Sequence, residues 1–217
     1  FENHMDFLSE DIQKYVEKNS QKEPKILKEL YTETWQKVLN PRMLSGAFQG
    51  RVLALISKLV QPQSILEIGT YTGYSALSLA EGLKKNGTLI TIDKNEELKN
   101  FAQHYFDKSS FKKNIVQLQG NALEIIPTLN KKFDLVFIDA DKANYCNYFH
   151  LIIEKMNKGA VILSDNVLWS GKVLTNPAAD DEDTKALIMY NKLLATDGRI
   201  ETVLLPIRDG LTISRVR

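Results

Sequence analysis

One stretch in the first half of the chain constrains the fold more than any other. Residues 64–75, SILEIGTYTGYS, run from a short apolar segment through a turn with two glycines into a segment typical of a helix. This order predicts a strand, a tight loop and the N-terminus of a helix. Because glycine lacks a Cβ atom, such a loop can bring backbone N–H groups close to a ligand.

Two acidic residues accompany this loop. Glu67 lies inside the apolar strand, where a carboxylate without a partner would be costly to bury. Asp93 ends the next apolar run, close to the ~20-residue spacing expected of a carboxylate that binds a ribose diol. The loop reads G-x-x-x-G and lacks the third glycine of the dinucleotide fingerprint G-x-G-x-x-G. The pattern therefore favours a nucleoside ligand without a diphosphate and disfavours an NAD-dependent dehydrogenase.

The rest of the chain alternates between strand-like and helix-like segments. Strands are expected at 64–68, 88–93, 114–119, 133–139, 160–165, 199–205 and 210–216. The alternation predicts an α/β fold with a Rossmann-like, doubly wound, mostly parallel seven-stranded sheet that ends in an antiparallel C-terminal hairpin. A helix over 52–60 should be buried, and a helix over about 144–157 should stop before Gly159.

Two extra amphipathic helices precede the first strand, one over 6–20 and one that begins at Pro24. They are expected to cover the site or to form the contact of a homodimer. Residues 1–4, before Met5, are interpreted as a remnant of cloning, and 5–217 as a single domain.

Composition narrows the possible partners. The net charge of +1 implies no broad attraction to nucleic acid or to an anionic membrane. Cys146 is the one cysteine, which fits a reducing cytoplasm and excludes an intrachain disulfide. No apolar run approaches the ~20 residues of a membrane span, so no membrane partner is expected.

Further polar residues lie at the predicted strand ends. Asp139 follows the fourth strand, and Asp165 and Asn166 follow the fifth. Ligands of such sheets bind at the carboxyl ends of the strands, and oxygen ligands suit a hard divalent ion such as magnesium. Lys142 lies in the loop after Asp139 and, beside a cation, would lose its proton more easily and act as a general base. Taken singly, Asp139 could instead cap a helix, and the pair after the fifth strand could form a turn.

The combined motifs carry a family resemblance. The segments 67–75 (EIGTYTGYS), 139–145 (DADKANY) and 165–171 (DNVLWSG) together resemble the cation-dependent, S-adenosylmethionine-dependent O-methyltransferases that act on catechols and caffeoyl-coenzyme A, especially small bacterial members. The likeness extends over nearly the whole chain from about residue 40. It implies a divalent metal held by Asp139, Asp165 and Asn166, with Lys142 as the catalytic base. It also implies S-adenosylmethionine bound by Met43, Ser45, Glu67, Gly69, Tyr71, Ser75, Asp93, Ala122 and Asp139.

Methylation of one hydroxyl of a vicinal diphenol is the expected reaction, with Lys142, Asn166 and Trp169 facing the substrate. Trp169 could equally be a core aromatic. Tyr145 and Tyr148 are assigned to packing, and Cys146 to a small buried hydrophobe.

Three other functions remain as alternatives. A tRNA hydroxyuridine O-methyltransferase of the same family is disfavoured by the balanced charge. An N-methyltransferase acting on bases usually carries an N-P-P-Y type motif after the fourth strand, where this chain has I-D-A-D. A non-catalytic binding module would not need Lys142 beside three oxygen ligands.

Overall fold

Three of the apolar runs become parallel strands. β1 (Ser64–Ile68) pairs with β2 (Thr88–Asp93), and β2 pairs with β3 (Ile115–Gln119). The register sets Glu67 opposite Thr91, and Thr91 opposite Gln117. All five residues of β1 are buried, as expected for a strand covered on both faces.

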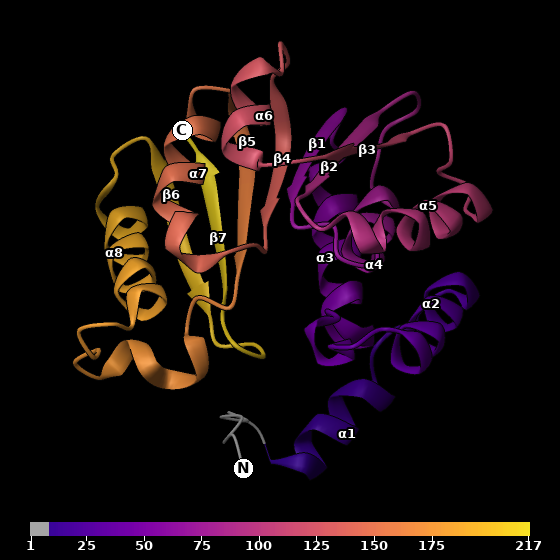
Figure 1. Ribbon diagram of the computed structural model, residues 1–217, viewed down its shortest axis with the longest axis horizontal. Coiled ribbons are helices and arrows are strands. Elements are labelled where there is room, and N and C mark those ends of the chain that lie inside the picture. The colour runs from indigo at the N-terminus through magenta and orange to yellow at the C-terminus, as the bar shows by residue number, and fades with distance from the viewer. Residues whose placement is uncertain (1–8) are drawn as a thin grey trace. The chain divides into compact units, whose positions relative to one another are not determined.

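The computed structural model describes residues 9–217, which form two compact units, 9–121 and 122–217 (Figure 1). The cloning remnant expected at 1–4 and the start of the domain at residue 5 lie outside the described residues. The single domain over 5–217 stays a prediction.

The first unit contains β1–β3 together with helices on either side of them in the chain. These are α1 (Glu10–Lys18), α2 (Lys25–Lys37), the 3₁₀ helix η1 (Pro41–Met43), α3 (Gly46–Val60), α4 (Tyr74–Ala80), η2 (Glu96–Leu98) and α5 (Lys99–Lys108). Helix α4 starts directly after the glycine loop, and all its residues are buried.

Helix α2 is an integral part of this unit. Leu27, Leu30 and Thr34 recur on one face of the helix and are buried, and α2 contacts α3, α4 and α5. The hydroxyl of Tyr105 on α5 hydrogen-bonds Glu33 on α2, and the hydroxyl of Tyr74 on α4 hydrogen-bonds Glu23 just before α2. In contrast, α1 has no buried residue. Of the two expected extra helices, α1 is therefore the one that buries no residue within this unit, and on α2 the exposed large side chains are Tyr31 and Trp35.

The prediction of a buried helix over 52–60 is only half right. Helix α3 buries Leu53, Ala54 and Ser57, but Leu55 and Leu59 are 60% and 78% exposed. By length and composition alone, Pro41–Val60 could also cross a membrane. Core helices of soluble proteins share this length and composition, and Arg51 and Lys58 of α3 both bind Glu81 at the end of α4.

The second unit contains a four-stranded mixed sheet in the order β4-β5-β7-β6. β4 (Phe133–Ile138) and β5 (Met156–Asp165) are parallel, whereas β7 (Leu211–Val216) is antiparallel to β5 and to β6 (Ile200–Leu205). The predicted C-terminal hairpin is thereby confirmed. The helical segments of this unit are α6 (Ala122–Thr128), η3 (Lys142–Asn144), α7 (Tyr145–Ile153), η4 (Trp169–Leu174) and α8 (Glu182–Thr196).

The boundary between α7 and β5 differs from the prediction. The helix expected to reach residue 157 ends at Ile153, and Gly159 lies within β5. The register between β4 and β5 shifts at this point, and Gly159 has a φ of 78°. Glycine adopts this conformation readily, so Gly159 accommodates an irregular strand and does not stop a helix.

Candidate active site

The glycine loop, residues 69–73, is hydrogen-bonded to the end of β2. The backbone N–H of Tyr71 donates to Asp93 Oδ2 at 2.7 Å, and the N–H of Asn95 donates to Asp93 Oδ1 at 2.8 Å. Gly73 has a φ of 89°, and a Cβ atom there would lie 2.6 Å from the ring of Phe106. The hydrogen bonds explain the acid at position 93, and the positive φ and the close approach of Phe106 explain the glycine at position 73.

Glu67 is fully buried, and two threonines meet its carboxylate. Thr91 Oγ1 donates to Glu67 Oε2 at 2.5 Å, and the hydroxyls of Thr70 and Thr91 lie 2.5 Å apart. A hydroxyl has one proton to donate, so Thr70 is the donor to Thr91. This chain of hydrogen bonds offsets part of the cost of burying the carboxylate.

Other predicted cofactor residues of the first unit lie on segments around the loop. Ser45 and Ser75 are buried, whereas Met43 on η1 is 63% exposed. The hydroxyl of Tyr71 donates to the carbonyl of Asn40 at 2.8 Å, which ties the loop to the segment before η1. Burial raises the pKa of Tyr71. Their roles in binding a cofactor stay predictions.

The second unit brings the predicted base and two predicted metal ligands into direct contact. Lys142 follows β4, and its Nζ donates to Asp139 Oδ1 at 3.2 Å and to Asn166 Oδ1 at 3.0 Å. The third acceptor is the hydroxyl of Tyr145, 2.6 Å away. An ammonium group has three hydrogens, so all three have an acceptor. Lys142 is only 7% exposed, which makes this full set of partners necessary.

Asp165 and Asn166 continue this cluster at the end of β5. Asp165 is buried, and its Oδ1 accepts a hydrogen bond from the N–H of Asn166 at 2.9 Å. The carbonyl of Asp165 accepts from the Tyr145 hydroxyl at 2.9 Å. Burial, followed by the negative charges of Asp139 and Asp165, raises the pKa of Tyr145 well above its ordinary value. Tyr145 therefore keeps its proton as a donor.

The donor set fits a hard cation. The side-chain oxygens of Asp139 and Asn166 already converge on a positive charge, the Lys142 ammonium, and both come from the ends of neighbouring parallel strands. Carboxylate and amide oxygens are ligands that magnesium accepts. Within residues 9–217, no three His, Cys, Asp or Glu side chains gather as a metal group. The predicted metal ligands include only two such side chains, Asp139 and Asp165, because the third ligand is the amide of Asn166.

Trp169 lies beside the same lysine. Lys142 Nζ is 5.8 Å from the centre of the indole ring, and Lys172 Nζ is 6.0 Å from it. Trp169 is only partly buried, which argues against a core aromatic. Ala122, the remaining predicted cofactor residue, is buried at the start of α6. The roles of both residues stay predictions.

Sequence reasoning missed one polar contact of this cluster. Tyr145 was assigned to packing, yet its hydroxyl contacts Lys142. The spacing of three residues between them, on one helical turn, could have indicated this contact.

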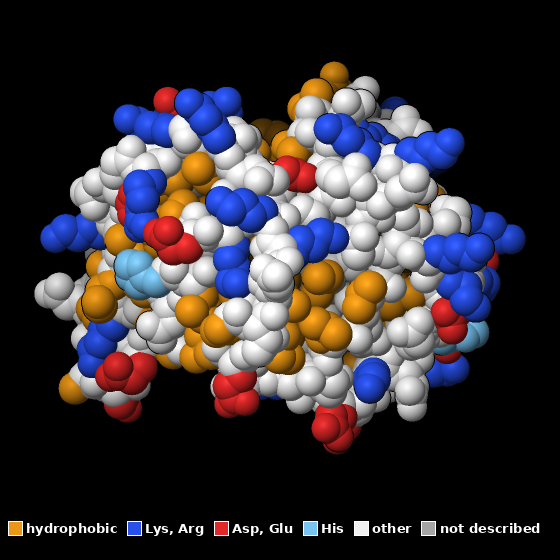
Figure 2. All heavy atoms as spheres, turned by 90° about the horizontal axis from the view of Figure 1, so that it is seen from above, with side chains coloured by type: hydrophobic (Ala, Val, Ile, Leu, Met, Phe, Trp, Pro, Cys, Tyr) orange, Lys and Arg blue, Asp and Glu red, His pale blue; other side chains and the backbone are white. Residues whose placement is uncertain are grey.

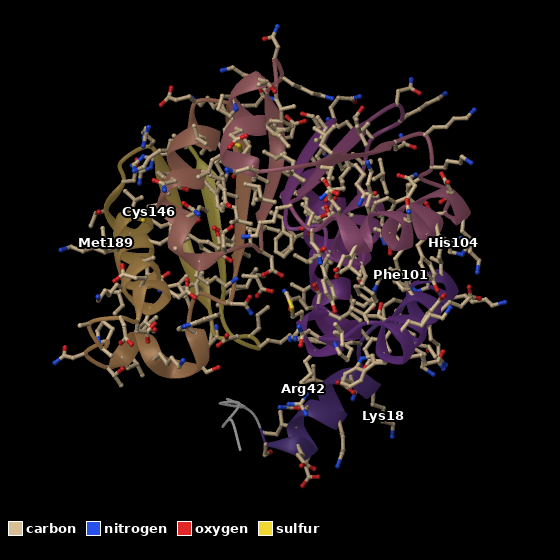
Figure 3. The ribbon with its side chains drawn as sticks, in the orientation of Figure 1. Lys18, Arg42, Phe101, His104, Cys146 and Met189 are labelled. Carbon is tan, nitrogen blue, oxygen red and sulfur yellow. The ribbon has the colours of Figure 1, made fainter. Side chains whose placement is uncertain are left out.

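Cys146 follows on α7 and is half-buried, and Met189 on α8 is exposed (Figure 3). Burial raises the pKa of the Cys146 thiol, which does not favour a reactive thiolate.

Comparison with known proteins decides the family. The sequence profile described as O-methyltransferase matches residues 17–217. The chain belongs to the O-methyltransferase family. This O-methyltransferase is 34% identical to caffeoyl-CoA O-methyltransferase 1 of Arabidopsis thaliana over 223 residues, which cover 95% of this chain and 85% of the relative.

Solved structures confirm the fold class of this O-methyltransferase. An SAH-bound methyltransferase from Podospora anserina is 28% identical, with a TM-score of 0.88 over 100% of this chain and 98% of that one. An O-methyltransferase from Bacillus cereus in complex with SAH is 26% identical, with a TM-score of 0.88 over 95% of this chain and 97% of that one. The predicted Rossmann-like seven-stranded sheet with an antiparallel C-terminal hairpin is therefore correct.

Proposed function

We propose that this O-methyltransferase uses a divalent metal, with magnesium as the preferred ion, to transfer a methyl group from S-adenosylmethionine to one hydroxyl of a vicinal diphenol. The observation that carries the proposal is the contact of Lys142 with Asp139 and Asn166 at the ends of two neighbouring parallel strands. A relative named for caffeoyl-CoA supports the substrate class, because a caffeoyl group carries two adjacent phenolic hydroxyls.

Support for S-adenosylmethionine comes from the first unit and from the solved relatives. Asp93 at the end of β2 is placed for a ribose diol, and it also holds the glycine loop through the N–H of Tyr71. Glu67 offers a fixed negative charge beneath that loop. Two solved methyltransferases of this fold contain SAH, the product that S-adenosylmethionine leaves after losing its methyl group.

Asp139, Asp165 and Asn166 are the residues that would hold the metal. A bound divalent ion would supply positive charge that favours ionised phenolic oxygens and orients them. In its neutral form the Lys142 amine would accept the proton that leaves the phenolic hydroxyl, and it would thereby become the ammonium that donates to Asp139 and Asn166. Trp169 offers an aromatic face beside this lysine for a planar substrate. The methyl–sulfur bond then breaks as the methyl–oxygen bond forms.

A tRNA hydroxyuridine O-methyltransferase is the second candidate, and one surface feature favours it. An open hollow of about 530 Å³ in the first unit is lined in part by Lys84, Lys85 and Lys113. Such a surface could contact phosphates. On the face seen in Figure 2, however, Lys and Arg side chains lie scattered among acidic and uncharged ones. This distribution and the net charge of +1 favour the small substrate.

A methyl-transfer assay with labelled S-adenosylmethionine separates the two candidates. We expect methylation of a catechol, no methylation of the matched phenol with a single hydroxyl, and none of tRNA that carries unmethylated hydroxyuridine. Methylation of the tRNA would instead establish the second candidate, provided that it is lost when Lys84, Lys85 and Lys113 are changed to Glu. Equal methylation of the catechol and the phenol would contradict the role of adjacent hydroxyls.

A further inference from the structure

Tyr145 occupies an unusual position for a core aromatic residue. Its side chain is 0% exposed, and its ring packs edge-on against Tyr190, with ring centres 5.2 Å apart. These features alone describe a packing residue. Its hydroxyl, however, lies 2.6 Å from Lys142 Nζ, which is the shortest of the three hydrogen bonds that the amine donates.

The direction of these hydrogen bonds follows from the proton count. The phenol has one proton, and the Asp165 carbonyl 2.9 Å away accepts it. The phenolic oxygen is then left to accept from Lys142. Tyr145 thus joins the lysine after β4 to the backbone at the end of β5, which carries Asp165 and Asn166.

We propose that Tyr145 is a positioning residue, which holds the Lys142 amine at a fixed distance from the end of β5. A lysine side chain has four rotatable bonds, and Asp139 and Asn166 bind it at the longer distances of 3.2 Å and 3.0 Å. The ring of Tyr145 is rigid and packs against Tyr190, so its hydroxyl is a third hydrogen-bond acceptor with a fixed position for the Lys142 amine. This inference rests on the proposed role of Lys142 as the base.

Tyr190 provides a matched control within the same unit. It is also 0% exposed, forms the other half of the ring pair, and has a hydroxyl that hydrogen-bonds the hydroxyl of Ser164 at 2.6 Å. The Tyr190 hydroxyl thus contacts a different residue from Lys142. Tyr145→Phe and Tyr190→Phe both remove one buried hydroxyl and keep the ring, so a general packing effect should be similar in the two variants.

The test measures the Lys142 amine directly and does not depend on turnover. Wild type and both variants are treated with a lysine-acylating reagent at one pH, and mass spectrometry gives the labelling rate of Lys142 relative to the exposed Lys85. Thermal melting confirms that each protein is folded at the labelling temperature. We expect Tyr145→Phe to raise the relative rate roughly three- to tenfold, as for the loss of one hydrogen bond, and Tyr190→Phe to leave it unchanged. Equal rates in the two variants would overturn the proposal.

Turnover then tests the consequence for catalysis. Misplacing a catalytic group slows chemistry without weakening the binding of a remote ligand, so Tyr145→Phe should lower kcat by about tenfold or more and leave the affinity for S-adenosylmethionine unchanged. Tyr190→Phe should keep a normal kcat. Normal kcat in Tyr145→Phe together with an inactive Lys142→Ala variant would show that Lys142 is the base and that Tyr145 does not position it. An inactive wild type would instead refute the proposed function, and the labelling rates would still decide the role of Tyr145.

Discussion

Lys142 is the residue on which the proposed chemistry depends most. Its replacement by alanine should slow catechol methylation by about 10²–10⁴-fold, the usual contribution of a general base, and should leave the affinity for S-adenosylmethionine unchanged. Lys172→Ala is the matched control, because Lys172 also lies beside the Trp169 ring. Initial rates at saturating substrate provide the measurement. A Lys142→Ala variant as fast as wild type would reduce this lysine to a structural partner of Asp139.

Asp93 carries the corresponding prediction for the cofactor. Asp93→Ala should weaken S-adenosylmethionine binding by roughly 1.5–3 kcal/mol, the scale of a hydrogen bond to a charged group. Calorimetry measures this loss, with Glu97→Ala as a control that removes one exposed negative charge from η2. Because Asp93 also accepts from Tyr71 and Asn95, a melting curve must accompany the titration. Unchanged affinity in a folded variant would remove Asp93 from the site.

The ion pairs that join α3 to the end of α4 make stability depend on pH. Burial would raise the pKa of Glu81, but hydrogen bonds from Arg51 and Lys58 outweigh it and lower the pKa below its ordinary value of 4.5. The stability that Glu81 contributes is therefore fully present above pH 4.5 and is lost as the pH falls through its lower pKa in the folded state.

Glu81→Gln should accordingly lower the free energy of unfolding by about 1–3 kcal/mol at pH 7. The difference from wild type should shrink once the pH falls below 4.5. Urea unfolding at a series of pH values gives this comparison. If the difference in free energy of unfolding between wild type and Glu81→Gln stayed constant down to the pH of acid unfolding, the ion pairs of Glu81 would not be the source of the pH dependence.

Prediction of these elements from sequence succeeded where a local pattern decides the structure. The β1 strand, the glycine turn and α4 follow from one apolar run and its glycines, and the shared contact of Asp139 and Asn166 with Lys142 follows from their places at parallel strand ends. The docking of α2 does not follow in this way, because Tyr105 and Glu33 are 72 positions apart in the chain. Exposure of Leu55 and Leu59 likewise depends on which side of α3 meets α4, which the mostly apolar run 52–60 does not reveal.

At the scale of the whole molecule, we expect a homodimer. Helix α1 buries none of its own residues, and Ile12 and Tyr15 on it are 50% and 69% exposed. Light scattering at micromolar concentration should therefore give twice the 24.7 kDa mass of one chain. The double change of Ile12 and Tyr15 to Asp should shift the mass towards that of one chain, whereas charge changes at Lys84 and Lys85 should not. A wild-type mass of one chain would refute the dimer.

The requirement for a divalent metal tests the central claim most directly, because the proposed metal site rests on the cluster of Asp139, Asp165, Asn166 and Lys142. The measurement is the initial rate of catechol methylation by chelator-treated protein, before and after magnesium is returned, with S-adenosylmethionine binding followed in the same samples. We predict no methylation above background without metal, recovery of the full rate with magnesium, and cofactor binding in both states. A full rate of methylation in the chelator-treated protein would contradict the metal mechanism.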